Sequence, residues 1–355
     1  MESFAKMKAT LKEIAEAASV NVSTASRALS GSYGVSQETR EKVLSTAKKL
    51  GYRPNLTARG LVTGKSHTIG LLVSDIRNPY FAEVARGVED TAFEAGFDVI
   101  LCNSDLKPAK QVKYLHSLLE KNVDGILMNS TAALTTEQCS ELASYGVPVT
   151  LLNRPAGKYP FSTVLGDNYE GGRLAGQYLF DLGHRSVAHL TGPRSHGNFA
   201  DRSRGFSSVW QSQRDTVGPI VIRGDHSFQG GYEIARTLFQ KHPEVTAVFA
   251  ANDVIALGVL RAAAETGRSI PGDLSVIGFD NLEFTALVHP ALTTIHQPKY
   301  EMGRAAVEIL LRQIRAKAAP LPEHQVFGVT LIERNSCCKR LLKSTSFSVG
   351  AREIA

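Results

Sequence analysis

Residues 9–55 read ATLKEIAEAASVNVSTASRALSGSYGVSQETREKVLSTAKKLGYRPN, and this stretch carries three helix signals in succession. Thr10, Asn21 and Ser36 have side-chain oxygens suited to capping a helix, and each precedes apolar residues at helical spacing. Only a few residues separate the first two stretches, whereas a glycine-containing turn and Gly51 end the second and third. We therefore predict three short helices, the first two joined by a tight turn.

The second predicted helix, Val22–Leu29, has one face that packs and one that stays open. Two short helices bury little surface alone, so the third must complete their core. The residues expected in that core are Leu11, Ile14, Ala15, Ala18, Ala25, Ala28, Leu29, Val43, Leu44, Ala47 and Leu50. The open face carries Val22, Ser23 and Arg27, which suit the major groove of DNA, where Arg27 can pair with guanine. The spacing alone leaves open a generic three-helix bundle with a solvated Arg27.

The positive charge of the chain is concentrated at its N-terminal end. The first 66 residues carry 11 lysines and arginines against 5 acidic residues, and this balance of +6 equals the net charge of all 355 residues. A basic segment on a neutral remainder is typical of a polyanion-binding module attached to another domain. The length of the chain also predicts two or three globular units.

From Thr68 onward, short apolar runs alternate with amphipathic stretches. Nine runs stand out: IGLLVSD, FDVILCN, VDGILMN, VPVTLLN, STVLGD, SVAHLTG, IVIRG, AVFAAND and LSVIGFD. This alternation predicts βα units, with parallel sheets covered by helices and a ligand site at the carboxyl ends of the strands. Five candidate polar residues fall at such ends: Asp75, Asn103, Asn153, Asn252 and Asp280.

The sequence lacks the motifs that are typical of several classes of protein. The chain has no GxGxxG after a strand, no GxxxxGK[ST], no GxSxG and no HExxH, which argues against an enzyme. Cys102, Cys139, Cys337 and Cys338 have no metal-ligand spacing, so we expect free thiols and no cofactor, although the adjacent pair leaves a redox or soft-metal role open. No apolar run is long enough to span a bilayer and the N-terminus lacks a signal-peptide core, so we expect a cytoplasmic protein without a membrane partner.

Residues 9–55 resemble the DNA-binding head of the lactose-repressor (LacI) family almost residue by residue. The family pattern reads T-x-x-D-V-A-x-x-A-G-V-S-x-x-T-V-S-R-x-L-N-G, followed by V-S-x-x-T-R-x-x-V and G-Y-x-P-N. The resemblance implies that Val22, Ser23 and Arg27 read bases. It also implies DNA contacts, several of them to the backbone, at Thr10, Thr24, Ser26, Asn55 and Ala58.

The chain departs from the family pattern at three positions in the head. Ser19 stands where glycine is usual, Asn21 where serine is usual, and Ala25 where valine is usual. The alanine removes core volume at the helix crossing, so we expect a slightly less stable head.

A linker bounded by Pro54 and Gly64 follows the predicted helices. The resemblance implies a hinge that becomes helical when two subunits sit on DNA, with Leu61 wedged into the minor groove. Gly60 costs about 1 kcal/mol of helix propensity, so we expect the order of this hinge to depend strongly on DNA. Packing of Leu61 against its own subunit is the alternative.

The rest of the chain resembles the periplasmic sugar-binding-protein fold that the family shares, so that the match spans residues 9–335. Its sharpest parts are DIRNPYF (75–81), DNYEGG (167–172), DRSRGF (201–206), ANDVIALG (251–258) and GFDN (278–281). The fold class implied is an all-α helix-turn-helix head plus an α/β two-lobed, periplasmic-binding-protein-like (type I) core with parallel sheets. The expected divisions are a head at 8–54, a hinge at 55–66, a core at 67–335 with lobe 1 at about 67–165 and 293–324 and lobe 2 at about 166–292 and 325–335, and a tail at 336–355.

Polar residues at the predicted strand ends and in these motifs indicate the ligand class. Sugars need planar, multi-pronged hydrogen-bonding side chains and flat aromatic faces. The candidates are Asp75, Asn78, Asn153, Arg154, Arg202, Asn252, Asp280 and Gln297, with the aromatic residues Tyr80, Phe81 and Phe228. The set resembles the pocket of ribose-type binding proteins, except that Asn153 replaces a usual aspartate, so another monosaccharide or a sugar acid fits as well, and two nearby arginines favour the acid. A structural Arg202–Asp280 ion pair, and a core role for the two adjacent aromatics, are the alternatives.

These features together predict a sequence-specific transcriptional repressor that is not an enzyme. We expect a homodimer on a near-palindromic operator, because the tail has no leucine heptads for a tetramer, with operator affinity controlled by a small effector. The alternatives are a solute-binding protein for sugar uptake, against which the basic head argues, and a purine-sensing regulator. His184, His189, His196 and His226 match no metal pattern, and we expect them at the surface or in loops.

Overall fold

The computed structural model describes residues 9–52, 64–129, 134–154, 161–193, 197–213, 217–316 and 321–340. The chain divides into two compact units, one ending at Ser66 and a larger one from His67 onward, which we call the head and the core. Six residues singled out above lie outside the described residues: Pro54, Asn55, Ala58, Gly60, Leu61 and His196.

The described part of the head contains the three predicted helices, α1 (Leu11–Ala17), α2 (Val22–Leu29) and α3 (Gln37–Lys49). All three predicted caps are confirmed. The side chains of Thr10, Asn21 and Ser36 each accept a hydrogen bond from the backbone N–H three residues later, over 3.3, 2.9 and 3.3 Å. These bonds satisfy backbone donors that the first helical turn leaves without partners.

The hydrophobic interior of the head is small and rich in alanine. Its buried residues are Ile14, Ala15, Ala18, Ala25, Ala28, Val43 and Ala47, with Leu11 and Leu29 partly buried against them. Leu44 and Leu50 were also predicted here, but their exposures of 47% and 44% show that this prediction was wrong. Leu44 follows Val43 by one residue and therefore lies about 100° further around the helix, while Leu50 is already the C-cap.

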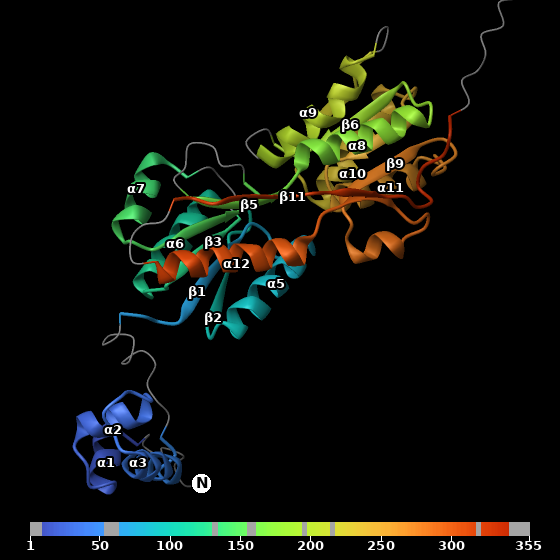
Figure 1. The fold of residues 1–355 in the computed structure, drawn as a ribbon. Coiled ribbons are helices and arrows are strands. Elements are labelled where there is room, and N and C mark those ends of the chain that lie inside the picture. Colours follow the sequence, from blue (N-terminus) through green and yellow to red (C-terminus); the bar gives the residue numbers. More distant parts are fainter. Residues whose placement is uncertain are drawn as a thin grey trace, which may run out of the picture. The chain divides into compact units, whose positions relative to one another are not determined.

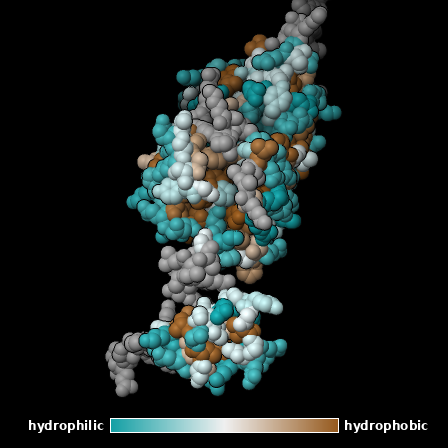
Figure 2. Space-filling model, turned by 60° about the vertical axis from the view of Figure 1, so that its left-hand side comes forward, coloured by the Kyte–Doolittle hydropathy of each residue, from teal (hydrophilic) through white to brown (hydrophobic). Residues whose placement is uncertain are grey.

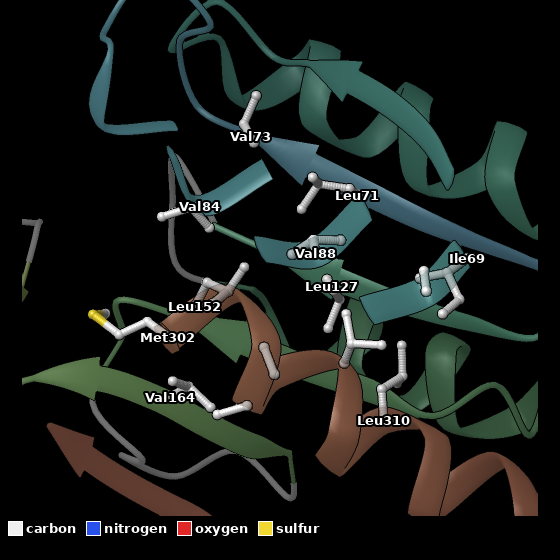
Figure 3. Close-up of a cluster of buried hydrophobic side chains, with 14 of the residues drawn as sticks. Ile69, Leu71, Val73, Val84, Val88, Leu127, Leu152, Val164, Met302 and Leu310 are labelled. Atoms are coloured by element: carbon white, nitrogen blue, oxygen red, sulfur yellow. The ribbon is translucent and has the colours of Figure 1, made fainter. Parts of the chain in front are cut away.

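The first lobe of the core is a six-stranded parallel sheet with helices on both faces (Figure 1). The strand order is β11-β5-β4-β3-β1-β2, where the strands are β1 (Thr68–Val73), β2 (Asp98–Asn103), β3 (Gly125–Met128), β4 (Val149–Leu152), β5 (Ser162–Gly166) and β11 (His324–Phe327). The helices are α5 (Tyr80–Glu94), α6 (Pro108–Glu120), α7 (Thr136–Ser144) and α12 (Lys299–Arg315). Successive strand residues face opposite sides, so Ile69, Leu71 and Val73 pack with α5 and α12 (Figure 3), whereas Leu72 packs with α6 and α7.

The second lobe repeats this arrangement with one antiparallel strand at its edge. The order is β12-β10-β9-β8-β6-β7, where the strands are β6 (Val187–Thr191), β7 (Ile220–Arg223), β8 (Ala247–Ala250), β9 (Ser275–Asp280), β10 (Thr293–His296) and β12 (Thr330–Ile332). Its helices are α8 (Asn168–Asp181), α9 (Gly197–Gln211), α10 (Phe228–Lys241), α11 (Asp253–Glu265) and the short 3₁₀ helix η1 (Glu283–Ala286). Only β12 runs antiparallel to its neighbour among the strands of the described residues. All nine apolar runs are strands, β1 to β9, as predicted.

The chain crosses between the lobes three times, but two crossings lie later than expected. Strand β10, at 293–296, pairs with β9 of the second lobe, and β11, at 324–327, pairs with β5 of the first. The expected boundaries at 293 and 325 were therefore wrong by a few residues. The expected tail from 336 also differs, because Ser336 is fully buried and Arg340 still donates its N–H to the Leu182 carbonyl at 2.7 Å.

Each closely packed helix pair crosses at two reciprocal glycines. The pairs are α5 with α12, α8 with α9, and α10 with α11. A Cβ atom on any of these glycines would collide with the backbone of the facing helix. The six residues are Gly87 and Gly303, Gly172 and Gly205, and Gly231 and Gly258. Glycine is required here because the two backbones approach too closely for any side chain.

The apolar runs of the chain are buried inside the two lobes. On the face shown in Figure 2, hydrophilic residues alternate with smaller groups of hydrophobic ones. No helix within the described ranges is long and apolar enough to cross a membrane. The long apolar runs instead supply the buried strands of the two sheets.

Two histidines expected at the surface or in loops are buried in the second lobe, so this prediction was wrong. His184 and His189 have exposures of 2% and 0%. Nδ1 of His189 donates to the Phe249 carbonyl at 3.0 Å, and Nε2 lies 2.9 Å from Oγ of Ser203. Burial lowers the pKa of His189 from 6.5 to about 3.

His189 makes the stability of the second lobe depend on pH. The folded protein keeps this imidazole neutral, whereas the unfolded chain takes up a proton below pH 6.5. Stability is therefore full above pH 6.5 and falls as the pH decreases, by about 1.4 kcal/mol per pH unit for this one group. We expect the unfolding free energy of the wild type to fall relative to that of His189→Phe by about that amount per pH unit between pH 6 and pH 4, as measured in urea titrations. A difference that stays constant with pH would contradict the assignment.

Candidate functional site

The predicted base readers lie together on the exposed face of α2. Val22 is 45% exposed, and Ser23, Ser26 and Arg27 are exposed beside it. Nε of Arg27 donates to the Ser23 carbonyl at 3.3 Å, which leaves the rest of the guanidinium on the open face. The arrangement can offer a guanidinium and a hydroxyl to base edges, while Thr10 remains in its cap at the start of α1.

Asn21 organises the N-terminus of this helix. Its Oδ1 accepts three hydrogen bonds, from Oγ of Ser23 at 2.8 Å and from the N–H and Oγ1 of Thr24 at 2.9 and 2.7 Å. The residue that departs from the family pattern therefore caps α2 and orients two of the predicted DNA-contacting hydroxyls.

A cavity of about 460 Å³ is lined by both lobes of the core. Ten of the eleven predicted ligand residues line it, namely Asp75, Asn78, Tyr80, Phe81, Asn153, Arg154, Arg202, Phe228, Asn252 and Asp280. They come from the carboxyl ends of strands of both sheets, from the loops that follow these strands, and from the helices that begin after those loops. Asn103 was a candidate at a strand end, but its side chain accepts from the Ile76 N–H at 3.2 Å and does not belong to the lining.

Arg202 and Asp280 form the buried polar centre of the second-lobe wall. The guanidinium of Arg202 lies over the Phe279 ring, 3.5 Å from its centroid, and Nη2 is 3.6 Å from Oδ1 of Asp280. Nε donates to Oδ1 of Asn168 at 2.8 Å, and Nη1 donates to the Ala251 carbonyl at 2.5 Å. Burial raises the pKa of the Asp280 carboxyl, and the Arg202 charge opposes that rise. The pair presents a cation and a carboxyl side by side to the cavity.

Gln297 lies behind Asp280 instead of in the lining. It is fully buried on the crossing between β10 and α12, and its Nε2 donates to Oδ1 of Asp280 at 2.6 Å. Nζ of Lys299 donates to the Asp280 carbonyl at 2.6 Å and lies 3.3 Å from Glu83 of α5. Asp280 is thus held, through its carboxyl by Gln297 and through its backbone carbonyl by Lys299, at the connection between the lobes.

Two of the predicted ligand residues in the cavity lining have positive φ angles. Asn153 has φ of 55°, and Asp280 has φ of 112°. Asparagine tolerates the first conformation, whereas the second is sparsely populated for any residue with a side chain. The Asp280 backbone is held there by its carbonyl contact with Lys299.

The first-lobe wall contains an ion pair that the sequence did not reveal. Arg77 makes a paired contact with Asp75, Nε to Oδ1 at 3.0 Å and Nη2 to Oδ2 at 2.8 Å. Oδ1 of Asn78 accepts from the Tyr80 N–H at 3.0 Å, which fixes the start of α5. The Tyr80 and Phe81 rings meet edge to face, 5.1 Å between centroids. They provide the flat apolar surface predicted for this wall.

Further lining residues of the second lobe were missed by sequence reasoning. Asn252 was predicted, and its Oδ1 caps α11 by accepting from the Ile255 N–H at 2.7 Å, while its Nδ2 donates to the His226 carbonyl at 3.4 Å. His226 itself lines the cavity. The other missed residues of this wall are Asn198, Phe199, Asp225, Ser227, Gln229 and Val254. Most of these lie at the starts of α9 and α10, and a reading based on strand ends does not single them out.

Comparisons with known proteins match both units of the chain. The family described as "Bacterial regulatory proteins, lacI family" matches residues 10–55, and the one described as "Periplasmic binding proteins and sugar binding domain of LacI family" matches residues 66–334. The ribose operon repressor of Halalkalibacterium halodurans is 37% identical over 87% of this chain and 91% of its own length. The repressor PurR of Edwardsiella ictaluri is 35% identical over 92% of this chain and 96% of its own length.

Solved structures agree with these matches. A LacI family regulator from Enterococcus faecium with bound ribose is 35% identical, with a TM-score of 0.70, over 77% of this chain and 100% of that one. The lac repressor dimer bound to operator and the anti-inducer ONPF is 28% identical, with a TM-score of 0.82, over 93% of this chain and 99% of that one. The predicted fold class is confirmed. The chain belongs to the LacI family of bacterial transcriptional regulators, in which a DNA-binding head is joined to an effector-controlled core.

Proposed function

We propose that this protein is a cytoplasmic, dimeric repressor whose effector is a monosaccharide or sugar acid bound in the cavity between the lobes, and that it has no catalytic activity. The observation that carries the proposal is the buried Arg202–Asp280 pair, set among amide side chains and aromatic rings at the strand ends. Planar donors and acceptors of this kind match adjacent hydroxyls, and the rings match C–H surfaces. The ribose operon repressor and the ribose-bound regulator among its relatives support the same ligand class.

The coupling that we propose runs from the cavity to the head. Residues of both lobes line the cavity, so an effector bound there gains contacts when the lobes close. Head residues 8–54, joined through a hinge at 55–66, would read the operator, with Val22, Ser23 and Arg27 contacting bases. Because two binding equilibria linked in this way must influence each other equally, effector and operator affinities are coupled reciprocally.

The first experiment is a thermal-shift screen of the full-length protein against D-ribose, other monosaccharides, sugar acids, sugar phosphates and purines. A ligand that binds only the folded state raises the melting temperature, so a shift with a sugar or sugar acid is the expected result. The same compound must then change operator affinity. Purines are included because PurR proteins are among the relatives, and a shift with purines alone would overturn the proposed effector class.

Replacing Arg27 tests the reading face of α2. We expect Arg27→Ala to relax base preference at one position in each half-site by about 1–3 kcal/mol, because the paired guanidinium contact is lost. The measurement compares single-base variants of an operator selected from random duplexes. Lys48→Ala on α3 is the matched control, since losing this cation should affect all sequences equally. Unchanged preference in Arg27→Ala would remove this residue as a reader.

A further inference from the structure

His226 is a titratable group built into the wall of the cavity. It lies in the loop between β7 and α10, and only 17% of its side chain is exposed. Its Nδ1 is 3.7 Å from Oδ1 of Asp225, and its ring centroid is 5.5 Å from that of Phe199 on α9. Asn252 at the start of α11 holds its backbone carbonyl. These contacts fix an imidazole where it faces a bound effector.

The charges around His226 leave the cavity neutral while the imidazole is neutral. The lining contains three arginines and three aspartates: Arg77, Arg154, Arg202, Asp75, Asp225 and Asp280. Arg77 is paired with Asp75, and Arg202 lies against Asp280. A proton on His226 therefore adds one positive charge to a balanced set. Because the arginines are matched by equal numbers of aspartates, they do not by themselves favour a sugar acid over a neutral sugar.

Burial governs the protonation of this group. It lowers the pKa of His226, and the carboxylates of Asp225 beside it and Asp75 on the first lobe oppose that shift without reversing it. A neutral imidazole offers one donor and one acceptor, which is the pattern of a hydroxyl group, and its ring faces suit C–H surfaces. An effector that displaces water from the cavity makes a charge there more costly.

We propose that His226 is a specificity-determining residue that, in its neutral form, selects an uncharged, hydroxyl-bearing effector, and that its protonation competes with effector binding. The inference rests on the proposed function, because it concerns the same cavity. It makes the regulator less responsive to its effector as the pH falls. An anionic effector would show the opposite dependence, since it would gain from the added charge.

The test is calorimetric titration of the full-length protein with D-ribose, D-gluconate and D-ribose 5-phosphate at pH 7.5 and pH 5.5. We expect D-ribose to bind more tightly than either anion, and to bind more weakly at pH 5.5 than at pH 7.5, by less than the roughly tenfold change that an imidazole with an unshifted pKa would give. His226→Gln keeps a donor and an acceptor but does not titrate, so its affinity for D-ribose should be the same at both pH values. His116→Gln removes an exposed histidine paired with Glu141, outside the cavity, and should retain the wild-type dependence.

The outcomes distinguish a failure of the role of His226 from a failure of the proposed effector class. D-ribose binding that does not change with pH, or that changes equally in His226→Gln, would overturn the role of His226 and leave the proposed effector class standing. Tighter binding of either anion, increasing at pH 5.5, would overturn the selection of an uncharged effector. If none of the three probes binds at either pH and the thermal-shift screen finds no other monosaccharide or sugar acid that binds, the proposed effector class fails, and the inference about His226 fails with it.

Discussion

Replacing Arg202 with leucine is expected to weaken effector binding by about 100-fold or more and to destabilise the core by about 3–5 kcal/mol. The guanidinium is 2% exposed and makes its contacts through Nε, Nη1 and Nη2. Leucine removes the cation from the cavity wall and leaves the buried carboxyl of Asp280 without the neighbouring charge that most favours its ionised form. Unfolding can be followed by fluorescence of Trp210, the single tryptophan of the chain, which is 1% exposed on α9.

Two further variants separate binding from folding. Arg202→Leu combined with Asp280→Asn removes both charges, so stability should recover in part while effector binding stays lost. Arg202→Lys keeps the charge but gives up the planar contact with the Phe279 ring, and should bind with intermediate affinity. Wild-type effector affinity in Arg202→Leu would show that the pair is only structural, which was the alternative left open by the sequence.

Placing one methyl group at Gly205 is expected to have the second large effect. The Cβ of alanine would collide with the Tyr169 carbonyl on α8, and this backbone atom cannot move without separating the two helices. We expect Gly205→Ala to lower the free energy of unfolding by about 3 kcal/mol or more, and the melting temperature by about 6–12 °C. Calorimetric and Trp210 fluorescence melts of the full-length protein measure both quantities.

Gly218 supplies the matched control for this prediction. No heavy atom of the described residues, other than those of its chain neighbours, lies within 4 Å of the position that its Cβ would occupy, so Gly218→Ala should leave the melting temperature nearly unchanged. Equal melting temperatures for Gly205→Ala and wild type would mean that α8 and α9 can separate at little cost. The effector affinity of Gly205→Ala should also fall, because α9 carries Arg202 and the crossing sets its distance from Asn168 of α8.

The features predicted correctly have local causes. A capping side chain and the helical spacing behind it lie within a few residues, which is why Thr10, Asn21 and Ser36 marked the helices of the head. Buried parallel strands are short apolar runs, so β1 to β9 were visible without knowledge of their partners. Residues that follow strand ends then identified most of the predicted cavity lining.

The features that were missed depend on pairings between distant segments. Strand β11 is recognised by its pairing with β5, about 160 residues earlier, and its own residues are mostly exposed. His189 lies within the apolar run predicted as a strand, now β6, and the rings that cover it, Phe206 and Phe249, come from distant parts of the chain. His226 lines the cavity because the loop that leads into α10 places its ring against Phe199 of α9, which comes earlier in the chain. Gln297 was predicted to line the cavity, but its side chain lies behind the lining and donates to Asp280.

The glycine-paired crossings determine which parts of this sensor an engineer can change. There is no room for even one additional carbon atom at those six positions. A mutagenesis library should therefore leave these glycines unchanged. The loop before α10, residues 225–227, lines the cavity and contains none of these glycines. Variation confined to this loop can therefore retune which molecule is detected while the scaffold that transmits the signal stays as it is.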